Sequence, residues 1–173
     1  MSNKEKTIYL ARHAKSAWDS GAPSDFDRPL SRRGVTDIMR IGAELKRLKW
    51  YPDKIISSPA LRAKQTCQTL CDQLSFPFDK VVWSQDIYAA YTVTLIQLLS
   101  VLPESVTRVM LIGHNPAMED LLVHFCSDAK AYRQKNGKLF TTGNIVKVTT
   151  QSSWKDVAMC EANLEKILRP KEL

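Results

Sequence analysis

Two histidines each stand just after a short apolar run in the sequence. His13 follows the run 8–11 after one arginine, and His114 follows the run 109–112 after one glycine. Short apolar runs of this kind are typical of buried strands, so each histidine stands where a strand is predicted to end. In a parallel sheet, the carboxyl ends of the strands open onto a crevice where ligands bind. Because the chain has only three histidines, two in matching contexts indicate a common site.

Two arginines are expected beside these histidines. Arg12 directly precedes His13, and Arg62 falls in the first turn of a helix that the serine–proline pair at 58–59 predicts. Guanidinium groups offer forked donors that match phosphate oxygens, and helix N-termini add backbone N–H groups. Such a pocket can bind a phosphoryl group without a metal ion. One imidazole nitrogen could then attack the phosphorus and form a phosphohistidine intermediate.

We assign the role of nucleophile to His13, because Arg12 is adjacent and the loop that follows is polar. The attacking nitrogen must be unprotonated, and a backbone carbonyl that accepts from the other ring N–H would fix that tautomer. His114 would then lie beside the phosphoryl group and stabilise its oxygens. Taken singly, each histidine is also compatible with a polar turn residue, and Arg62 with a solvated one. His124 lies between apolar residues and is expected to be structural or at the surface.

Strand-like and helix-like segments alternate along the chain. Apolar residues recur at intervals of three and four over 35–49, which predicts an amphipathic helix. Further helices are predicted over 58–74, 92–102 and 116–126, and strands at 8–11, 54–57, 81–83, 108–112, 144–150 and 156–160. The polar stretch 18–29 is expected to be a loop. This order predicts an α/β fold with three α/β/α layers, in which a mostly parallel central sheet has an antiparallel edge.

Size and composition indicate one globular domain over residues 1–173, with a polar tail over about 164–173 that is expected to fray. The chain is 44% hydrophobic and 25% charged, which is ordinary for a globular protein. Its four cysteines lack metal-ligand spacing, so we expect free thiols and neither a metal nor a cofactor. The sequence has no signal-like or membrane-spanning stretch, which predicts a cytoplasmic protein with no membrane partner.

The formal net charge of +7 bears on the partners of the protein. The basic residues are spread along the chain, and the short clusters at 31–33 and 46–49 carry no interleaved aromatic residues. Nucleic acid is therefore not expected as a partner. A positive field would instead attract phosphorylated or acidic partners. The sequence does not indicate an oligomeric state.

Several of these segments resemble the signatures of one family. The residues Arg-His-Ala-Lys-Ser at 12–16 resemble the RHG or RHA signature of the histidine phosphatase superfamily, which has the phosphoglycerate mutase-like fold. Segments 57–66 and 113–116 are similar to its SSPxxRAxxT and second-histidine blocks, and 27–34 to its D-RPL-x-x-x-G segment. Residues 87–90, 114–120 and 140–143 favour the SixA-like branch, whose members include phosphohistidine phosphatases.

The resemblance implies a role for each matching residue. It implies that His13 is the nucleophile, and that the phosphate pocket is formed by Arg12, Arg62 and His114. Larger relatives place a glutamate acid near the position of Asp86 or just beyond, so by resemblance Asp86 could serve as the proton donor. The sequence leaves Asp19 and Asp27 open as alternative donors. We also assign substrate binding to the polar neighbours of the two histidines, which are Lys15, Ser16 and Asn115.

The chemistry of the leaving group separates the candidate substrates. An alkoxide that leaves a phosphate ester gains about 10²–10⁴-fold in rate from a proton donor. A phosphohistidine leaves as imidazole and needs less help, and a short chain without long insertions leaves an open pocket that suits a phosphoprotein. We therefore expect a phosphatase that removes phosphate from phosphohistidine in proteins. A small-molecule phosphomonoesterase on the same fold is the alternative, and a non-catalytic phospho-binding module is a more distant one.

Overall fold

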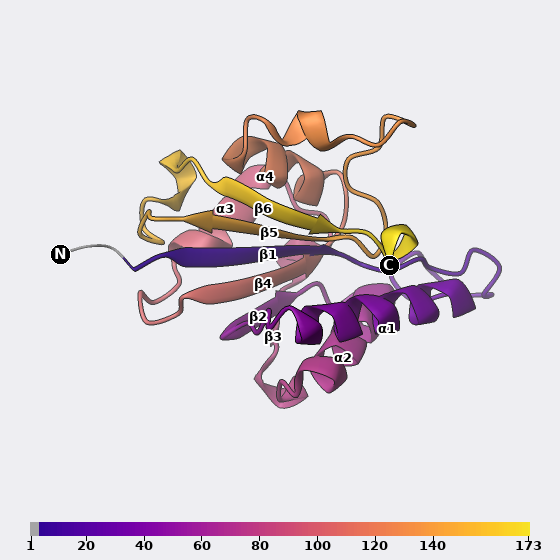
Figure 1. Ribbon diagram of the computed structural model, residues 1–173. Helices are drawn as coiled ribbons and strands as arrows, with labels where there is room; N and C mark the ends of the chain where they lie inside the picture. The colour runs from indigo at the N-terminus through magenta and orange to yellow at the C-terminus, as the bar shows by residue number, and fades with distance from the viewer. Residues whose placement is uncertain (1–3) are drawn as a thin grey trace.

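The computed structural model describes residues 4–173, which form a six-stranded sheet with the strand order β3-β2-β4-β1-β5-β6 (Figure 1). The strands are β1 (Lys6–Arg12), β2 (Lys54–Ser57), β3 (Val82–Trp83), β4 (Arg108–Gly113), β5 (Ile145–Thr150) and β6 (Asn163–Leu168). The first four in this numbering pair in parallel, and β5 and β6 add an antiparallel edge. The predicted fold class, a mostly parallel sheet with an antiparallel edge, is confirmed.

Helices cover both faces of the sheet. They are α1 (Arg32–Arg47), α2 (Leu61–Leu74), α3 (Thr92–Ser100) and α4 (Ala117–Phe125). Helices α1 and α2 pack together on one face, and α3 packs with α4 on the other (Figure 1). Short 3₁₀ turns connect the elements at η1 (Phe78–Lys80), η2 (Gln85–Ile87), η3 (Ala129–Tyr132), η4 (Val157–Met159) and η5 (Pro170–Glu172). Among the helices of residues 4–173, none combines the length and the apolarity that a membrane crossing requires.

The alternation of side chains along β1 explains the three layers. Ile8 and Leu10 belong to the core beneath α3 and α4, whereas Tyr9 and Ala11 belong to the core beneath α1 and α2. All four side chains are buried, as expected for a central strand that is covered on both faces. The four cysteines are buried free thiols, which confirms the expectation for them: Cys67, Cys71, Cys126 and Cys160.

Strand pairing brings the ends of β1, β2 and β4 to one edge of the sheet. Arg12 at the end of β1 is in register with Gly113 at the end of β4. The backbone of His13 donates to Gly113 O at 3.1 Å, and that of Ser58 donates to Ile112 O at 3.0 Å. The chain segments that follow these strands therefore leave the sheet next to one another.

The helices α2 and α4 begin beyond the prolines that the sequence predicted as their first residues. They begin at Leu61 and Ala117, and neither has a side-chain cap. The polar residues predicted as caps make other contacts: Ser58 Oγ lies 2.8 Å from His114 Nε2, and Asn115 Nδ2 donates to a loop carbonyl at 2.8 Å. The prediction of these caps was wrong because the same polar groups are used to position the site.

The carboxyl-terminal region also differs from the prediction. Residues 156–160 do not form a strand but contain the turn η4, and the strand that pairs with β5 is β6. The segment 164–168, predicted to belong to a fraying tail, is thus an edge strand. Ile167 and Leu168 are buried and hold it to the core, while its other residues are half-buried or exposed. The polar character that suggested a tail is typical of an edge strand.

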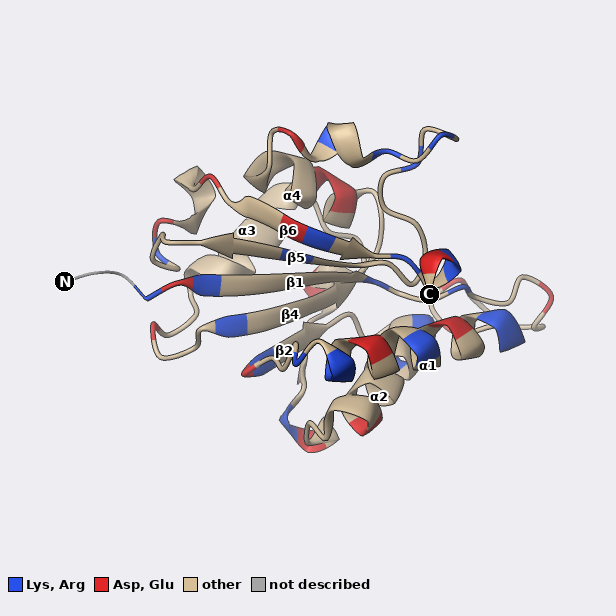
Figure 2. Ribbon diagram, in the orientation of Figure 1, with Lys and Arg blue, Asp and Glu red and all other residues tan. Residues whose placement is uncertain are grey.

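Helix α1 begins three residues before the predicted position at 35, because the Ser31 side chain caps it by accepting from Gly34 N at 3.1 Å. The basic residues of α1 are exposed (Figure 2). Gly34 packs on the chain that follows His13, and a Cβ at this position would lie 2.1 Å from Lys15 O. Ser31 also donates to Lys15 O, through its N–H at 2.8 Å and its hydroxyl at 3.0 Å. The start of α1 therefore rests directly on the loop that carries the predicted site.

We expect Gly34→Ala to lower the free energy of unfolding by about 1–3 kcal/mol, because the new methyl group would overlap a main-chain oxygen. This cost outweighs the gain in helix propensity, which is about 1 kcal/mol. Urea denaturation followed by circular dichroism measures the difference. Met39→Ala, on an exposed position of the same helix, is the control and should change stability by less than about 1 kcal/mol. Unchanged stability of Gly34→Ala would contradict the close contact.

Candidate active site

His13 lies at the end of β1 and is buried. Its Nδ1 is 2.7 Å from Ala14 O, and because a carbonyl oxygen can only accept, Nδ1 carries the proton. Nε2 then has a free lone pair, which accepts a hydrogen bond from Arg62 Nε at 3.3 Å. The contacts of the ring thus select the tautomer with an unprotonated Nε2, as expected from the sequence for an attacking imidazole.

Both imidazoles of the cluster are neutral at pH 7. Burial is the largest cause that lowers the pKa of His13. The hydrogen bond to the Ala14 carbonyl opposes it, but with the contributions of His114, Arg62 and Arg12 the pKa falls to about 3. Burial and the positive charge of Arg62 together lower the pKa of His114 to about 4, against the opposing effect of the Asp25 carboxylate. The same buried, cationic surroundings that keep the rings neutral would favour the binding of an anion between them.

Arg62 is the centre of the cluster. It lies in the first turn of α2 and is buried. Its Nη2 is 3.4 Å from His114 Nδ1, and its Nε reaches His13, so one guanidinium contacts both imidazoles. The two rings have their centroids 5.0 Å apart. Because Arg62 donates to Nδ1 of His114, the Nε2 proton of that ring is free to donate to Ser58 Oγ.

Arg12 is the last residue of β1, and its side chain lies beside the same cluster. Its Nη1 donates to Phe140 O at 2.9 Å, and Asn115 Nδ2 donates to the same carbonyl. Its Nε is buried and has no hydrogen-bond partner in the described part of the chain. Burial lowers the pKa of Arg12, and the carboxylate of Glu119 opposes this shift. Arg12 therefore offers a second guanidinium with an unused donor.

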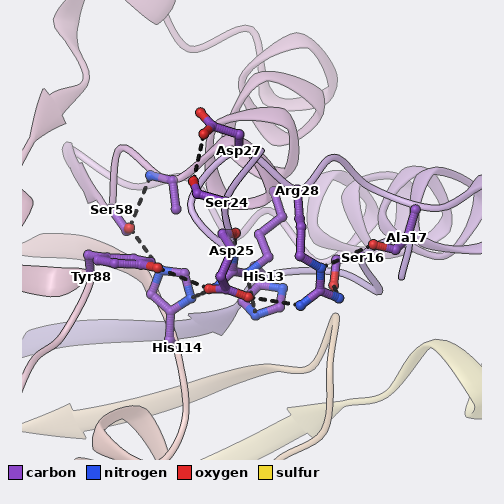
Figure 3. A network of polar contacts seen from close by, with 12 residues as sticks. His13, Ser16, Ala17, Ser24, Asp25, Asp27, Arg28, Ser58, Tyr88 and His114 are labelled. Atoms are coloured by element: carbon purple, nitrogen blue, oxygen red, sulfur yellow. Dashed lines mark hydrogen bonds and ion pairs between the residues drawn. The ribbon is translucent and has the colours of Figure 1, made fainter. Parts of the chain in front are cut away.

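The loop 18–29 supplies a carboxylate to the cluster (Figure 3). Asp25 Oδ2 accepts from Arg62 Nη2 at 2.9 Å and from the Tyr88 hydroxyl at 3.0 Å, and Asp25 Oδ1 accepts from Arg28 Nη1 at 2.8 Å. Burial acts to raise the pKa of Asp25, but the hydrogen bonds from Arg28, Tyr88 and Arg62 together lower it to about 2. The ionised carboxylate thus takes up donors of Arg62 that a bound oxyanion would use.

Arg28 is a third guanidinium near the cluster, and the predicted site did not include it. It stacks on the Trp18 ring at 3.8 Å from the centroid and donates to Ser16 Oγ at 2.7 Å and to Ala17 O at 3.1 Å. Ser16, predicted to bind substrate, therefore contacts Arg28 and positions it. A sequence signal for Arg28 existed, because it lies in the 27–34 segment whose family resemblance was noted.

The structure brings together the side chains of Arg12, His13, Arg62 and His114, as predicted. It does not bring Asp86 into this cluster. Asp86 is exposed on the turn η2, and within residues 4–173 no hydrogen bond or ion pair joins it to the cluster. The turn instead buries the next residue, and it is Tyr88 whose ring packs edge-on against His114 at 5.5 Å between centroids.

The remaining residues predicted to bind substrate line a hollow beside the cluster. Lys15, Asn115 and Arg12 all contribute to its wall, and its volume is about 480 Å³.

Sequence reasoning missed Ser58, Tyr88 and Asp25 as part of the site. Ser58 and Tyr88 lie in segments noted for their family resemblance, whereas nothing in the sequence distinguishes Asp25 from an ordinary loop residue.

Comparison with known proteins identifies a family and several similar proteins. Residues 8–82 match the model of the histidine phosphatase superfamily (branch 1). The chain is 30% identical to an uncharacterised protein of Mycobacterium tuberculosis, Rv1276c, over 84% of this chain and 90% of that protein. It is 29% identical to the phosphohistidine phosphatase SixA of Escherichia coli K12, over 84% and 86%.

Two further matches define how far the likeness extends. A solved structure assigned as a phosphohistidine phosphatase SixA from Agrobacterium tumefaciens has a TM-score of 0.81 at 28% identity, covering 95% of this chain and 98% of that one. An uncharacterised chloroplastic protein of Arabidopsis thaliana is 29% identical to the chain described here, but this chain spans only 56% of that protein's length.

The first prediction from this geometry concerns pH. The ring signals of His13 and His114 should not titrate in NMR spectra between pH 8 and pH 5, because their pKa values are about 3 and 4. Unfolding restores pKa values of about 6.5, so the unfolded chain binds more protons below that pH. Stability should therefore be highest above about pH 6.5 and fall as the pH is lowered towards 4. A His13→Gln/His114→Gln variant should lose less stability over this range, and titration near pH 6.5 in the folded wild type would contradict the prediction.

A second prediction concerns the carboxylate of Asp25. We expect Asp25→Asn to bind sulfate or tungstate about three- to tenfold more tightly, because a neutral amide competes less for Arg62 and Arg28. Isothermal titration calorimetry at low salt measures the change. Asp27→Asn is the matched control, since Asp27 lies in the same loop and accepts from the Ser24 hydroxyl at 2.6 Å. Equal affinities of the Asp25 variant and the wild type would show that the carboxylate does not compete.

Proposed function

This chain belongs to the histidine phosphatase superfamily, and we propose that it is a phosphatase that forms a phosphohistidine intermediate on His13. The observation that carries the proposal is the tautomer of His13. The Nδ1 proton is directed to Ala14 O at 2.7 Å, which leaves the Nε2 lone pair facing the guanidinium of Arg62. A neutral imidazole with a lone pair beside an anion-binding group is a nucleophile aimed at phosphorus.

The proposed reaction has two steps. His13 Nε2 attacks the phosphorus and the leaving group departs, and a water molecule then attacks the phosphohistidine and releases inorganic phosphate. Arg12 and Arg62 hold the phosphoryl oxygens, and His114 lies next to them at 5.0 Å between ring centroids. The guanidinium groups supply the positive charge that phosphoryl transfer requires, so the pocket needs no metal ion for this purpose. Asp25 leaves Arg62 when the phosphoryl group enters.

We further propose that the substrate is phosphohistidine in a protein. Asp25 is the carboxylate hydrogen-bonded to the cluster, and its pKa of about 2 keeps it ionised, so it has no proton to give to a departing alkoxide at neutral pH. An imidazole that leaves phosphohistidine can take its proton from water. The name of the similar protein from Escherichia coli, phosphohistidine phosphatase SixA, and the assignment of the Agrobacterium tumefaciens structure to the same class also support this substrate class.

Phosphoryl transfer to His13 can be tested directly. After incubation with ³²P-labelled phosphoramidate and a rapid quench, the wild-type protein should carry an acid-labile, alkali-stable label, and His13→Ala should carry none. His124→Ala is the matched control, because this exposed imidazole lies in α4, where its Nε2 is 2.9 Å from Ala158 O, and its removal should leave the labelling unchanged. Label retained by His13→Ala would refute the choice of nucleophile.

The substrate class needs its own comparison. The wild-type kcat/KM for a phosphohistidine peptide should exceed that for each member of a panel of small phosphate esters, by at least the roughly 10²-fold that a missing proton donor costs an ester. A kcat/KM for an ester as high as that for the peptide would instead favour a small-molecule phosphomonoesterase. Binding of the peptide with no turnover would indicate a phospho-binding module.

A further inference from the structure

A second hollow adjoins the one beside Arg12. Its volume is about 170 Å³, and it lies between the start of α1, the loop before β5 and the carboxyl-terminal turn η5. Five basic side chains and one acidic side chain line it, and Figure 2 shows basic residues of these three segments at one end of the molecule. The basic residues that line it are Lys15, Arg33, Lys138, Arg169 and Lys171.

The positive charge of this hollow is only partly neutralised. Asp37 is the acidic residue in its wall, and it pairs with Arg33 at 3.3 Å. Arg169 pairs with Glu172 at 3.4 Å. For the three lysines in the wall, no carboxylate within ion-pair distance is found in residues 4–173. The hollow therefore has a net positive charge that attracts an anion.

Buried donors in the same wall also lack partners. Asn144 is fully buried, and its Oδ1 accepts from Thr141 Oγ1 at 3.0 Å, but its Nδ2 has no partner among the residues that the structure describes. The same holds for Nε of Arg169, which is buried although Nη2 of that side chain donates to Tyr132 O at 2.8 Å. A buried donor without an acceptor is unfavourable, so both atoms would gain from a ligand oxygen.

The second hollow lies next to the first, to whose wall Arg12 belongs. Asn144 O accepts from the backbone of Arg12 at 3.1 Å, and Gly143 N donates to His13 O at 3.0 Å. The two hollows also share wall residues, which are Lys15, Lys138, Thr141 and Thr142. A molecule with its phosphoryl group on Arg12 can therefore reach the second hollow with a neighbouring group.

We propose that the second hollow is a carboxylate-binding site, which receives an aspartate or glutamate side chain of the substrate protein a few residues away from its phosphohistidine. This inference rests on the proposed function. Exposed lysine side chains adapt to a carboxylate on a flexible peptide, and the open walls of both hollows leave room for an extended segment. No aromatic side chain is present among the lining residues of the second hollow, so it offers no platform for a nucleic-acid base.

The test compares two phosphohistidine peptides that differ only in having glutamate or glutamine at positions two to five residues from the phosphohistidine. Wild-type protein should hydrolyse the glutamate peptide with a kcat/KM about three- to tenfold higher, and added salt should reduce this preference. An Arg33→Gln/Lys171→Gln variant should lose the preference. Both side chains are exposed and line the second hollow without lining the first, so hydrolysis of phosphoramidate should be unchanged.

A control variant removes the same charge elsewhere. Lys46→Gln/Lys80→Gln changes two exposed lysines that line neither hollow, and it should keep the wild-type preference. If wild-type protein hydrolyses both peptides at equal kcat/KM, the carboxylate site is refuted while the proposed function stands. If the control loses the preference as well, the effect comes from net charge and the assignment to this hollow is wrong.

Binding can be followed without turnover, which separates failure of the site from failure of the proposed function. In NMR titrations, the side-chain amide signals of Asn144 should shift with an unphosphorylated glutamate peptide and not with its glutamine counterpart. This result would support the site even if no phosphohistidine peptide were hydrolysed. A shift at lower concentrations of inorganic phosphate than of the glutamate peptide would identify a site for free anions and overturn the proposed source of the carboxylate.

Discussion

The parallel pairing of β1 with β4 is the constraint on which the rest of the site depends. The register that sets Arg12 opposite Gly113 makes the residues that follow these strands leave the sheet at one place. Two imidazoles separated by a hundred residues of sequence thereby come within 5.0 Å of each other, between ring centroids. β2 pairs with the other side of β4 and is followed by the helix that carries Arg62. The sheet thus brings to one edge the residues at and after its strand ends, and these residues form the cluster.

Burial determines what these groups can do once they are together. A solvated histidine would be partly protonated near neutral pH, and its lone pair would be lost in that fraction. Burial and neighbouring guanidiniums instead keep His13 neutral, and the Ala14 carbonyl selects which nitrogen holds the proton. Positive charge is concentrated on arginines, which stay ionised in such surroundings. The cluster thus combines an uncharged imidazole with positively charged guanidinium groups.

Much of this arrangement could be predicted from the sequence, because apolar runs locate strands and the polar residues after them locate a site. The prediction failed where a residue's role depends on tertiary contacts. Ser58 is of a residue type that commonly caps helices, but its hydroxyl forms a hydrogen bond with His114. Asp25 lies in an irregular loop, and only the folded chain shows its carboxylate on Arg62. β6 was missed because the solvated face of an edge strand has the polar pattern of a disordered tail.

The carboxylate of Asp25 affects how readily a bound anion leaves the cluster. Because an internal anion already neutralises Arg62, the entry of any external anion is an exchange of one negative group for another. The net electrostatic free energy gained when an anion binds Arg62 is therefore small. Asp25 is tethered within the same molecule, so it competes with a released oxyanion for Arg62 at high effective concentration. In the proposed reaction, Asp25 would thereby help to displace inorganic phosphate from Arg62, so that accumulated product would not saturate the site.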